Sequence, residues 1–201
     1  MSLSSPSKRT GRRAGTSDTR ERIAAAAQSL FAEVGYERTT FRRIAEAAGV
    51  DPALVVHFYG SKEELFRQVM VLPPAVNEAL RQLADGPRDS VGRRLAEIVV
   101  GGLENPASRA ILLGRIRSAS SNEEAAALLR ETLAGDIQQL AAAVSQDRPE
   151  LRAVLVGTQI VGLAVARYVV RVEPLASLEP EEIVDVLAPT FQRYLVEPLT
   201  S

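Results

Sequence analysis

The residue types that carry enzyme and metal chemistry are scarce in this chain. His57 is the only histidine among 201 residues, and cysteine is absent. A zinc site with two histidines or with thiolate ligands is therefore excluded, and so are disulfides. The nucleophile pattern G-x-S-x-G and the phosphate-binding patterns G-x-x-x-x-G-K-[ST] and G-x-G-x-x-G do not occur. Among the enzyme mechanisms considered, only catalysis by Asp and Glu carboxylates is not excluded by these patterns. We expect that the protein is not an enzyme and binds neither a metal nor a cofactor.

His57 instead lies in a region whose charges suit a polyanionic partner. Residues 1–62 carry 10 Lys and Arg against 6 Asp and Glu, whereas residues 63–201 carry 14 against 19. Arg42 and Arg43 precede His57, and Lys62 follows it. Positive charge concentrated in one part of a nearly neutral chain favours nucleic acid as the partner of that part. Chance asymmetry is the alternative.

The elements that must position these side chains are short helices. Caps and glycines predict four of them near the N-terminus, at 17–34, 40–48, 52–59 and 61–71. Thr40 and Asp51 are N-cap types, and Pro52 suits a first helical position. Gly49 suits the left-handed residue that follows a helix. The second and third helices are therefore separated by a very short turn.

Helical spacing continues to the C-terminus. We expect further helices near 75–84, 88–103, 106–118, 122–145, 149–171 and 180–196. No run alternates in the manner of a strand, so the predicted fold is all-α. The predicted organisation is a flexible basic arm at 1–16, a small unit at 17–72 and a larger unit at 73–201.

The second and third helices have the spacing of a helix-turn-helix, whose second helix lies in a DNA major groove. At about 100° per residue, the third helix has two distinct sides. The side predicted to face the core holds Val55, Phe58 and Tyr59. The side predicted to face a partner holds Ala53, Val56 and His57. These outward residues are small or moderately polar, so a base edge or a phosphate can approach the helix closely.

The stretch TTFRRIAEAAGVDPALVVHFYGSKEELF resembles the DNA-binding domain of TetR-type (TetR/AcrR) transcriptional regulators. The A-G-V turn, the N-cap acid, the aromatic pair and the S-K-E-E-L start occur in register over about residues 17–70. The resemblance implies a helix-turn-helix DNA-binding domain at 17–72 and a helical ligand-binding and dimerisation domain at 73–201. The DNA contacts that it implies are Thr40, Arg42, Arg43, Pro52, Ala53, Val56, His57 and Lys62.

The resemblance also implies roles for these residues. Thr40 would cap its helix and touch a phosphate, Arg42 would reach a base edge or a phosphate, and Lys62 would hold the DNA backbone. Arginine paired with guanine is the commonest specific contact, which favours Arg42 as a base reader. Arg43 is either a second DNA contact or a solvated helix residue. The basic arm would enter the minor groove or only aid solubility, through Lys8, Arg9, Arg12 and Arg13.

One position departs from the pattern of the family. A tyrosine that contacts phosphate is frequent there where this chain has Val56, and a histidine is frequent where it has Phe58. We expect His57 to supply part of the missing polar contact. Which residues of the third helix read bases stays open.

The function implied by the resemblance is a sequence-specific transcriptional regulator. It would be a repressor that binds a palindromic operator in double-stranded DNA as a homodimer, through helices 149–171 and 180–196, and is released by a small-molecule effector. The effector would bind among helices 75–171, with an ordinary structural role as the alternative for each candidate anchor: Arg115, Arg117, Gln159 and Tyr168. A ligand-independent regulator, an activator and a helical protein-interaction module are the alternative functions.

Neither the N-terminus nor the longest apolar stretch indicates a membrane. The N-terminus MSLSSPSKRTGRR lacks the apolar region of a secretory signal. The stretch Ala153–Ala166 has 14 residues, a length that fits a buried helix better than a membrane span. We therefore expect a cytoplasmic protein without a membrane partner.

Overall fold

The computed structural model describes residues 12–145 and 147–199, with side chains for all of these except 12–16, 132–134 and 136. Its described elements are helical and include no strand, which confirms the all-α fold. The α-helices are α1 (Arg12–Arg38), α2 (Phe41–Ala48), α3 (Pro52–Tyr59), α4 (Lys62–Val69), α5 (Pro74–Gln82), α6 (Val91–Glu104), α7 (Pro106–Ala119), α8 (Glu123–Val144), α9 (Pro149–Ala164) and α10 (Pro180–Val196). Short 3-10 helices occupy Leu83–Asp85 and Arg88–Ser90, and a π-helix occupies Val165–Val170.

α1 differs from the prediction at its start. It begins at Arg12, so residues 12–16 of the predicted arm belong to a helix, while residues 1–11 of that arm lie outside the described residues. Gly35 interrupts the helix where its end was predicted, with φ 80° and ψ 177°. A positive φ of this size suits glycine, because a side chain would collide with the backbone.

Aromatic packing holds the N-terminal unit together. The ring of Phe31 meets that of Phe66 edge to face, with centroids 4.8 Å apart, and Tyr36 meets Phe66 at 5.2 Å. Phe31 and Phe66 are fully buried. Burying each large apolar side chain contributes about 1.5–3 kcal/mol. This core joins α1 to α4 and provides the base on which α2 and α3 rest.

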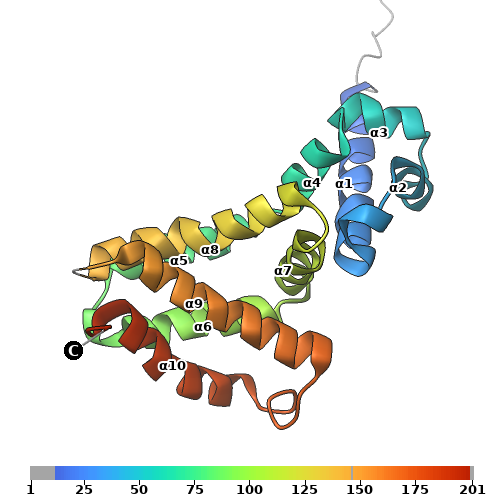
Figure 1. Cartoon of the computed structure of the whole chain (residues 1–201). Helices are drawn as coiled ribbons and strands as arrows, with labels where there is room; N and C mark the ends of the chain where they lie inside the picture. Colours follow the sequence, from blue (N-terminus) through green and yellow to red (C-terminus); the bar gives the residue numbers. More distant parts are fainter. Residues whose placement is uncertain (1–11, 146, 200–201) are drawn as a thin grey trace, which may run out of the picture.

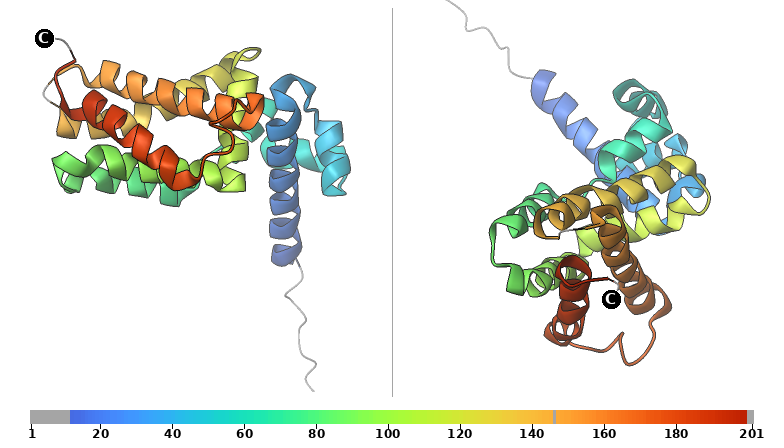
Figure 2. Two further views of the ribbon diagram at one scale, coloured as in Figure 1. Left: turned by 90° about the horizontal axis from the view of Figure 1, so that it is seen from below. Right: turned by 60° about the vertical axis from the view of Figure 1, so that its left-hand side comes forward.

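The second unit comprises α5 to α10, and it lies to the lower left of the N-terminal unit in Figure 1. Figure 2 shows α1 running across the direction of the long helices α8 and α9. α6 and α10 approach closely at Gly92, whose N–H donates to Oε1 of Gln192 at 2.8 Å. A Cβ on Gly92 would lie 2.4–2.7 Å from backbone atoms of α10. Only glycine allows this contact without separating the two helices.

α7 joins the two units. The backbone N–H of Tyr36 in α1 donates to Oγ of Ser118 in α7 at 2.9 Å, and this bond is buried. Arg117 of α7 donates from Nη1 to the carbonyl of Ala32 in α1. The N-terminal unit is therefore attached to the second unit by directed hydrogen bonds as well as by apolar packing.

α9 and its π-helical continuation form a long apolar helix that is only partly buried within a single copy of the chain. The helix Pro149–Val170 is long and apolar enough to cross a membrane by length and composition, but only 28% of its most apolar window is buried. Val154 is 50% exposed and Val170 is 63% exposed. Part of this segment is therefore left uncovered in a single copy of the chain, and the same helix was predicted to contact a second copy. Its packing partners within the chain, chiefly α8 and α10, leave the opposite side open.

Candidate DNA-binding interface

The turn between α2 and α3 is fixed by hydrogen bonds from both sides. Oγ1 of Thr40 accepts from the N–H of Arg43 at 3.3 Å, so α2 begins as predicted. Gly49 has φ 63° and ψ 43°, the left-handed conformation predicted for it. Arg22 of α1 donates from Nη2 to the carbonyl of Gly49 at 3.1 Å and also to that of Ala48. Sequence reasoning did not single out Arg22, because nothing in its spacing relates it to the turn.

α3 presents the two sides that the sequence predicts. Val55 and Tyr59 are buried and Phe58 is half-buried, so the inward side is confirmed. Oη of Tyr59 donates to the carbonyl of Arg20 at 3.0 Å, which ties α3 to α1. The N-cap Asp51 accepts from the N–H of Ala53 at 2.7 Å. The exposed outward residues are Pro52, Ala53, Val56 and His57.

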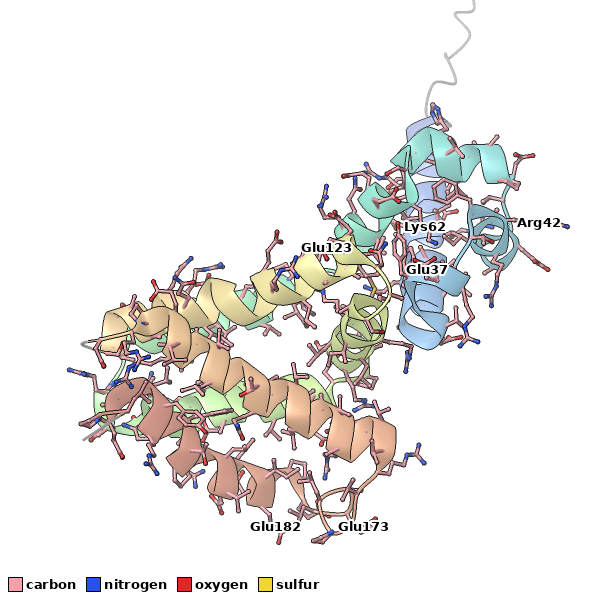
Figure 3. All side chains as sticks on the ribbon, in the orientation of Figure 1. Glu37, Arg42, Lys62, Glu123, Glu173 and Glu182 are labelled. Carbon is pink, nitrogen blue, oxygen red and sulfur yellow. The ribbon has the colours of Figure 1, made fainter. Side chains whose placement is uncertain are left out.

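The two arginines of α2 have different surroundings. Arg42 is exposed and points away from the domain in Figure 3, and within the described residues it has no hydrogen-bond or ion-pair partner. Arg43 is also exposed, but its Nη1 donates to the carbonyl of Arg38 at 2.7 Å. Arg42 is thus available to a ligand, whereas Arg43 already stabilises the connection between α1 and α2.

Lys62 does not project freely from the start of α4. Its Nζ lies 4.1 Å from the centroid of the Tyr36 ring, a cation–π contact, and its side chain is half-buried. Burial lowers the pKa of Lys62, while Glu37 and Glu63 act in the opposite direction. Figure 3 shows Lys62 and Glu37 on neighbouring parts of α4 and α1. Tyr36 therefore sets the position of the lysine that was expected to hold the DNA backbone.

Tyr36 is itself held in place. Its Oη donates to Oε1 of Glu63 at 2.8 Å, and its ring is buried among Phe31 and Phe66. Burial, with the hydrogen bond to Glu63 as a second cause, raises the pKa of Tyr36 well above its ordinary value. The phenol therefore stays protonated and keeps donating to Glu63 at any ordinary pH.

A cavity of about 290 Å³ lies in the second unit, between α5, α6, α7 and α8. Its wall is mainly aliphatic, with contributions from Leu80, Val99 and Leu112 among others. Among the residues with described side chains, the polar ones in this wall are Asn77, Ser108, Arg115 and Glu131. Such a mixture of an apolar wall with a few polar groups is typical of a site for a small molecule.

The structure separates the four candidate anchors. Arg115 lines the cavity and is 5% exposed. Gln159 is not among the lining residues, and Arg117 is used at the junction of the two units. Tyr168 donates from Oη to Oε1 of Glu104 at 2.7 Å, away from the lining. Of the four, only Arg115 is placed to meet a molecule in the cavity.

The arrangement agrees with known families over most of the chain. Residues 23–69 match the family described as bacterial regulatory proteins of the tetR family. Residues 89–195, more than half of the chain, match the tetracyclin repressor-like C-terminal domain. The first match contains α2, the turn, α3 and α4, and the second contains α6 to α9 and nearly all of α10.

Similar proteins include solved structures with the same fold and a curated repressor that matches over part of its length. A TetR-family regulator from Streptomyces coelicolor A3 is 38% identical, with 92% of this chain and 99% of that chain covered and a TM-score of 0.66. The HTH-type transcriptional repressor AcnR of Corynebacterium efficiens is 35% identical over 89 residues, 44% of this chain and 43% of AcnR. The chain thus spans less than half of that curated relative. A complex of SmeT with triclosan, 18% identical with 91% and 99% coverage and a TM-score of 0.60, shows the same fold.

Proposed function

Because the chain belongs to the TetR family of bacterial transcriptional regulators, we propose that it is a repressor that binds a palindromic operator as a homodimer and leaves it when a small molecule binds. The observation that carries this proposal is the exposed outward side of α3, which rests on the aromatic core of the N-terminal unit. Arg42 lies on the neighbouring helix α2 and, within the described residues, has no hydrogen-bond or ion-pair partner. A regulator of this kind acts on DNA in the cytoplasm and performs no enzymatic reaction.

The proposed DNA contacts lie on exposed positions of α2 and α3 and at the start of α4: Thr40, Arg42, Arg43, Pro52, Ala53, Val56, His57 and Lys62. α3 would enter the major groove, with Arg42 reaching a guanine. Thr40 and Lys62 would meet phosphates.

Homodimer formation follows from two properties of the chain. One α3 helix contacts only a few base pairs, whereas two copies related by a two-fold axis contact two half-sites of an inverted repeat. The uncovered apolar side of α9 provides a surface for the second copy, with Val154 at 50% and Val169 at 51% exposure. Leaving such a surface in water costs about 25 cal/mol for each Å². Pairing of α9 and α10 with those of a partner would remove that cost.

The cavity in the second unit is the proposed effector site. Its wall is mainly aliphatic, so the effector should be a largely apolar molecule with a few polar atoms. SmeT, whose fold is similar, forms a complex with the small molecule triclosan. An effector that binds more tightly to the conformation with misplaced α3 helices would shift the dimer away from DNA, and operator DNA would weaken effector binding by the same factor.

Selection of bound fragments from the source genome tests the proposal. The purified protein is mixed with sheared genomic DNA, and retained fragments are sequenced. We expect an inverted repeat, with binding that weakens steeply as salt rises because phosphate contacts release counterions. Retention of all fragments alike would contradict sequence-specific regulation. Retention of none at low salt would favour a protein-interaction module.

A further inference from the structure

Two backbone carbonyls at the end of α4 accept hydrogen bonds from side chains of different units. They belong to Val69, the last residue of α4, and to Met70, the residue that follows it. The carbonyl of Val69 accepts from Nε2 of Gln28 in α1 at 2.7 Å. The carbonyl of Met70, the residue that ends the helix, accepts from Arg115 in α7, at 2.6 Å from Nε and also from Nη2. Carbonyls at the end of a helix have no partner in the helix itself. Both of these are instead satisfied by specific side chains.

Arg115 belongs to the cavity as well as to this junction. It lines the cavity, and so do Val71 and Leu72, the two residues that follow Met70. A molecule that fills the cavity therefore touches the chain directly after α4 and the side chain that holds the end of α4. Within the described residues, no other cavity-lining side chain donates to a carbonyl of α4 or of the residue that ends it.

The backbone of α7 lies close to Met70 and to α1 at the residue before Arg115. A Cβ on the preceding residue, Gly114, would lie 2.5 Å from Cε of Met70 and 2.9 Å from Cα of Ala32. Arg115 itself is 5% exposed, and burial lowers its pKa to about 10, so it remains charged at neutral pH. If the guanidinium leaves the carbonyl of Met70, the N–H groups that it donates there need other acceptors, because an unsatisfied buried donor is costly.

We infer that Arg115 is the positioning residue through which a molecule in the cavity acts on α4. An occupant that displaces the guanidinium from the carbonyl of Met70 releases the end of α4. The start of α4 carries Lys62 and packs under α3, so the DNA-binding surface moves with it. This inference rests on the proposed function, and it adds the contact by which occupancy of the cavity reaches the DNA-binding domain.

The test does not require the natural effector. The chain contains no cysteine, so Asn77→Cys introduces a single thiol in the cavity wall. Hexyl methanethiosulfonate transfers its hexylthio group to that thiol as a disulfide and releases methanesulfinate. Mass spectrometry verifies complete labelling, and fluorescence anisotropy measures the affinity for the operator recovered by genomic selection. Labelling of N77C should weaken operator binding by about 10-fold or more, within the range of known coupling between sites.

Arg115→Met in the N77C background removes the donor and keeps most of the side-chain volume. Labelling of this double variant should weaken operator binding by less than about 3-fold. Arg117→Met is the matched control, since Arg117 also donates from α7 to a carbonyl of the N-terminal unit but does not line the cavity. N77C with R117M should respond to the label as N77C does. Equal responses in the R115M and R117M backgrounds would overturn the inference.

Two further readouts keep the outcomes apart. If R115M does not fold, Arg115→Lys replaces it, because lysine keeps the charge but cannot direct two N–H groups at one carbonyl. Hydrogen exchange at residues 70–72 should accelerate on labelling of N77C and should already be fast in the unlabelled variant at Arg115. A labelled N77C that binds the operator as before would refute effector control by the cavity, and this inference with it. Failure to recover any operator would refute the proposed function itself.

Discussion

Arg42→Ala isolates one proposed base contact. Within the described residues the Arg42 side chain is exposed and has no hydrogen-bond or ion-pair partner, so its removal takes no such bond from the folded protein. The free energy of unfolding should change by no more than about 0.5 kcal/mol. A guanidinium that donates two hydrogen bonds to one guanine contributes about 1–3 kcal/mol of discrimination. That range corresponds to a loss of about 5- to 150-fold in affinity for each half-site, and the dimer loses the contact at both half-sites.

The assay is fluorescence anisotropy on the recovered operator and on versions in which each base pair is changed in turn. R42A should bind the native operator more weakly by the factor above and should lose its preference at one position in each half-site. The remaining positions should keep their preferences. An equal loss on every operator version would refute base recognition and would assign Arg42 to a phosphate contact.

Arg43→Ala is the matched control on the same helical turn. Arg43 donates to the carbonyl of Arg38 at 2.7 Å, so its removal should lower the free energy of unfolding by about 0.5–1.5 kcal/mol. Base preferences should stay unchanged, even where overall affinity falls. The assignment of the two arginines is wrong if R43A, rather than R42A, erases a preference.

Three further predictions concern the structure that supports recognition. Gly92→Ala should lower Tm, because overpacking against α10 costs about 1–3 kcal/mol and each kcal/mol shifts Tm by about 2–4 °C in a chain of this size. Gly101→Ala should raise Tm, because its Cβ would meet nothing within 4 Å and alanine favours a helix. Calorimetry measures both, and shifts of the same sign would contradict the close α6–α10 contact. Val154→Glu should turn dimers into monomers in analytical ultracentrifugation, and a persistent dimer would exclude this face of α9 as the interface. Asp51→Ala should lower the free energy of unfolding, measured with urea, by about 0.5–2 kcal/mol, because the N-cap hydrogen bond to Ala53 is lost. An unchanged free energy would show that Pro52 alone fixes the start of α3.

The helices of the N-terminal unit were predictable because their signals are local. The bounds of α3, Pro52–Tyr59, agree with the prediction, since an N-cap acid, a proline and a following glycine all act within one turn. The start of α1 was not predictable in the same way. Residues 12–16 offer no apolar periodicity or cap in the sequence, yet they continue a helix whose later turns pack against α2 and α4.

The contacts that position the interface depend on residues far apart in the chain. Lys62 lies over Tyr36, Arg22 holds the turn after α2, and Arg115 holds the residue that ends α4. Periodicity identifies the sides of single helices, but it carries no information about which helices meet. The same reason explains α9: its apolar character was evident, but its exposure depends on where α8 and α10 lie.

The replacement of a frequent tyrosine by Val56 changes what the outward side of α3 can do. Val56 is 48% exposed and has no donor, and Ala53 beside it is also apolar. In a major groove such side chains suit the methyl group of thymine, whereas His57 can exchange hydrogen bonds with a base edge or a phosphate. We propose that phosphate contacts come instead from residues outside α3, namely Thr40 before α2 and Lys62 at the start of α4. The cation–π contact with Tyr36 holds Lys62 at the start of α4, where Lys62 would supply a phosphate contact that Val56 has no donor to make.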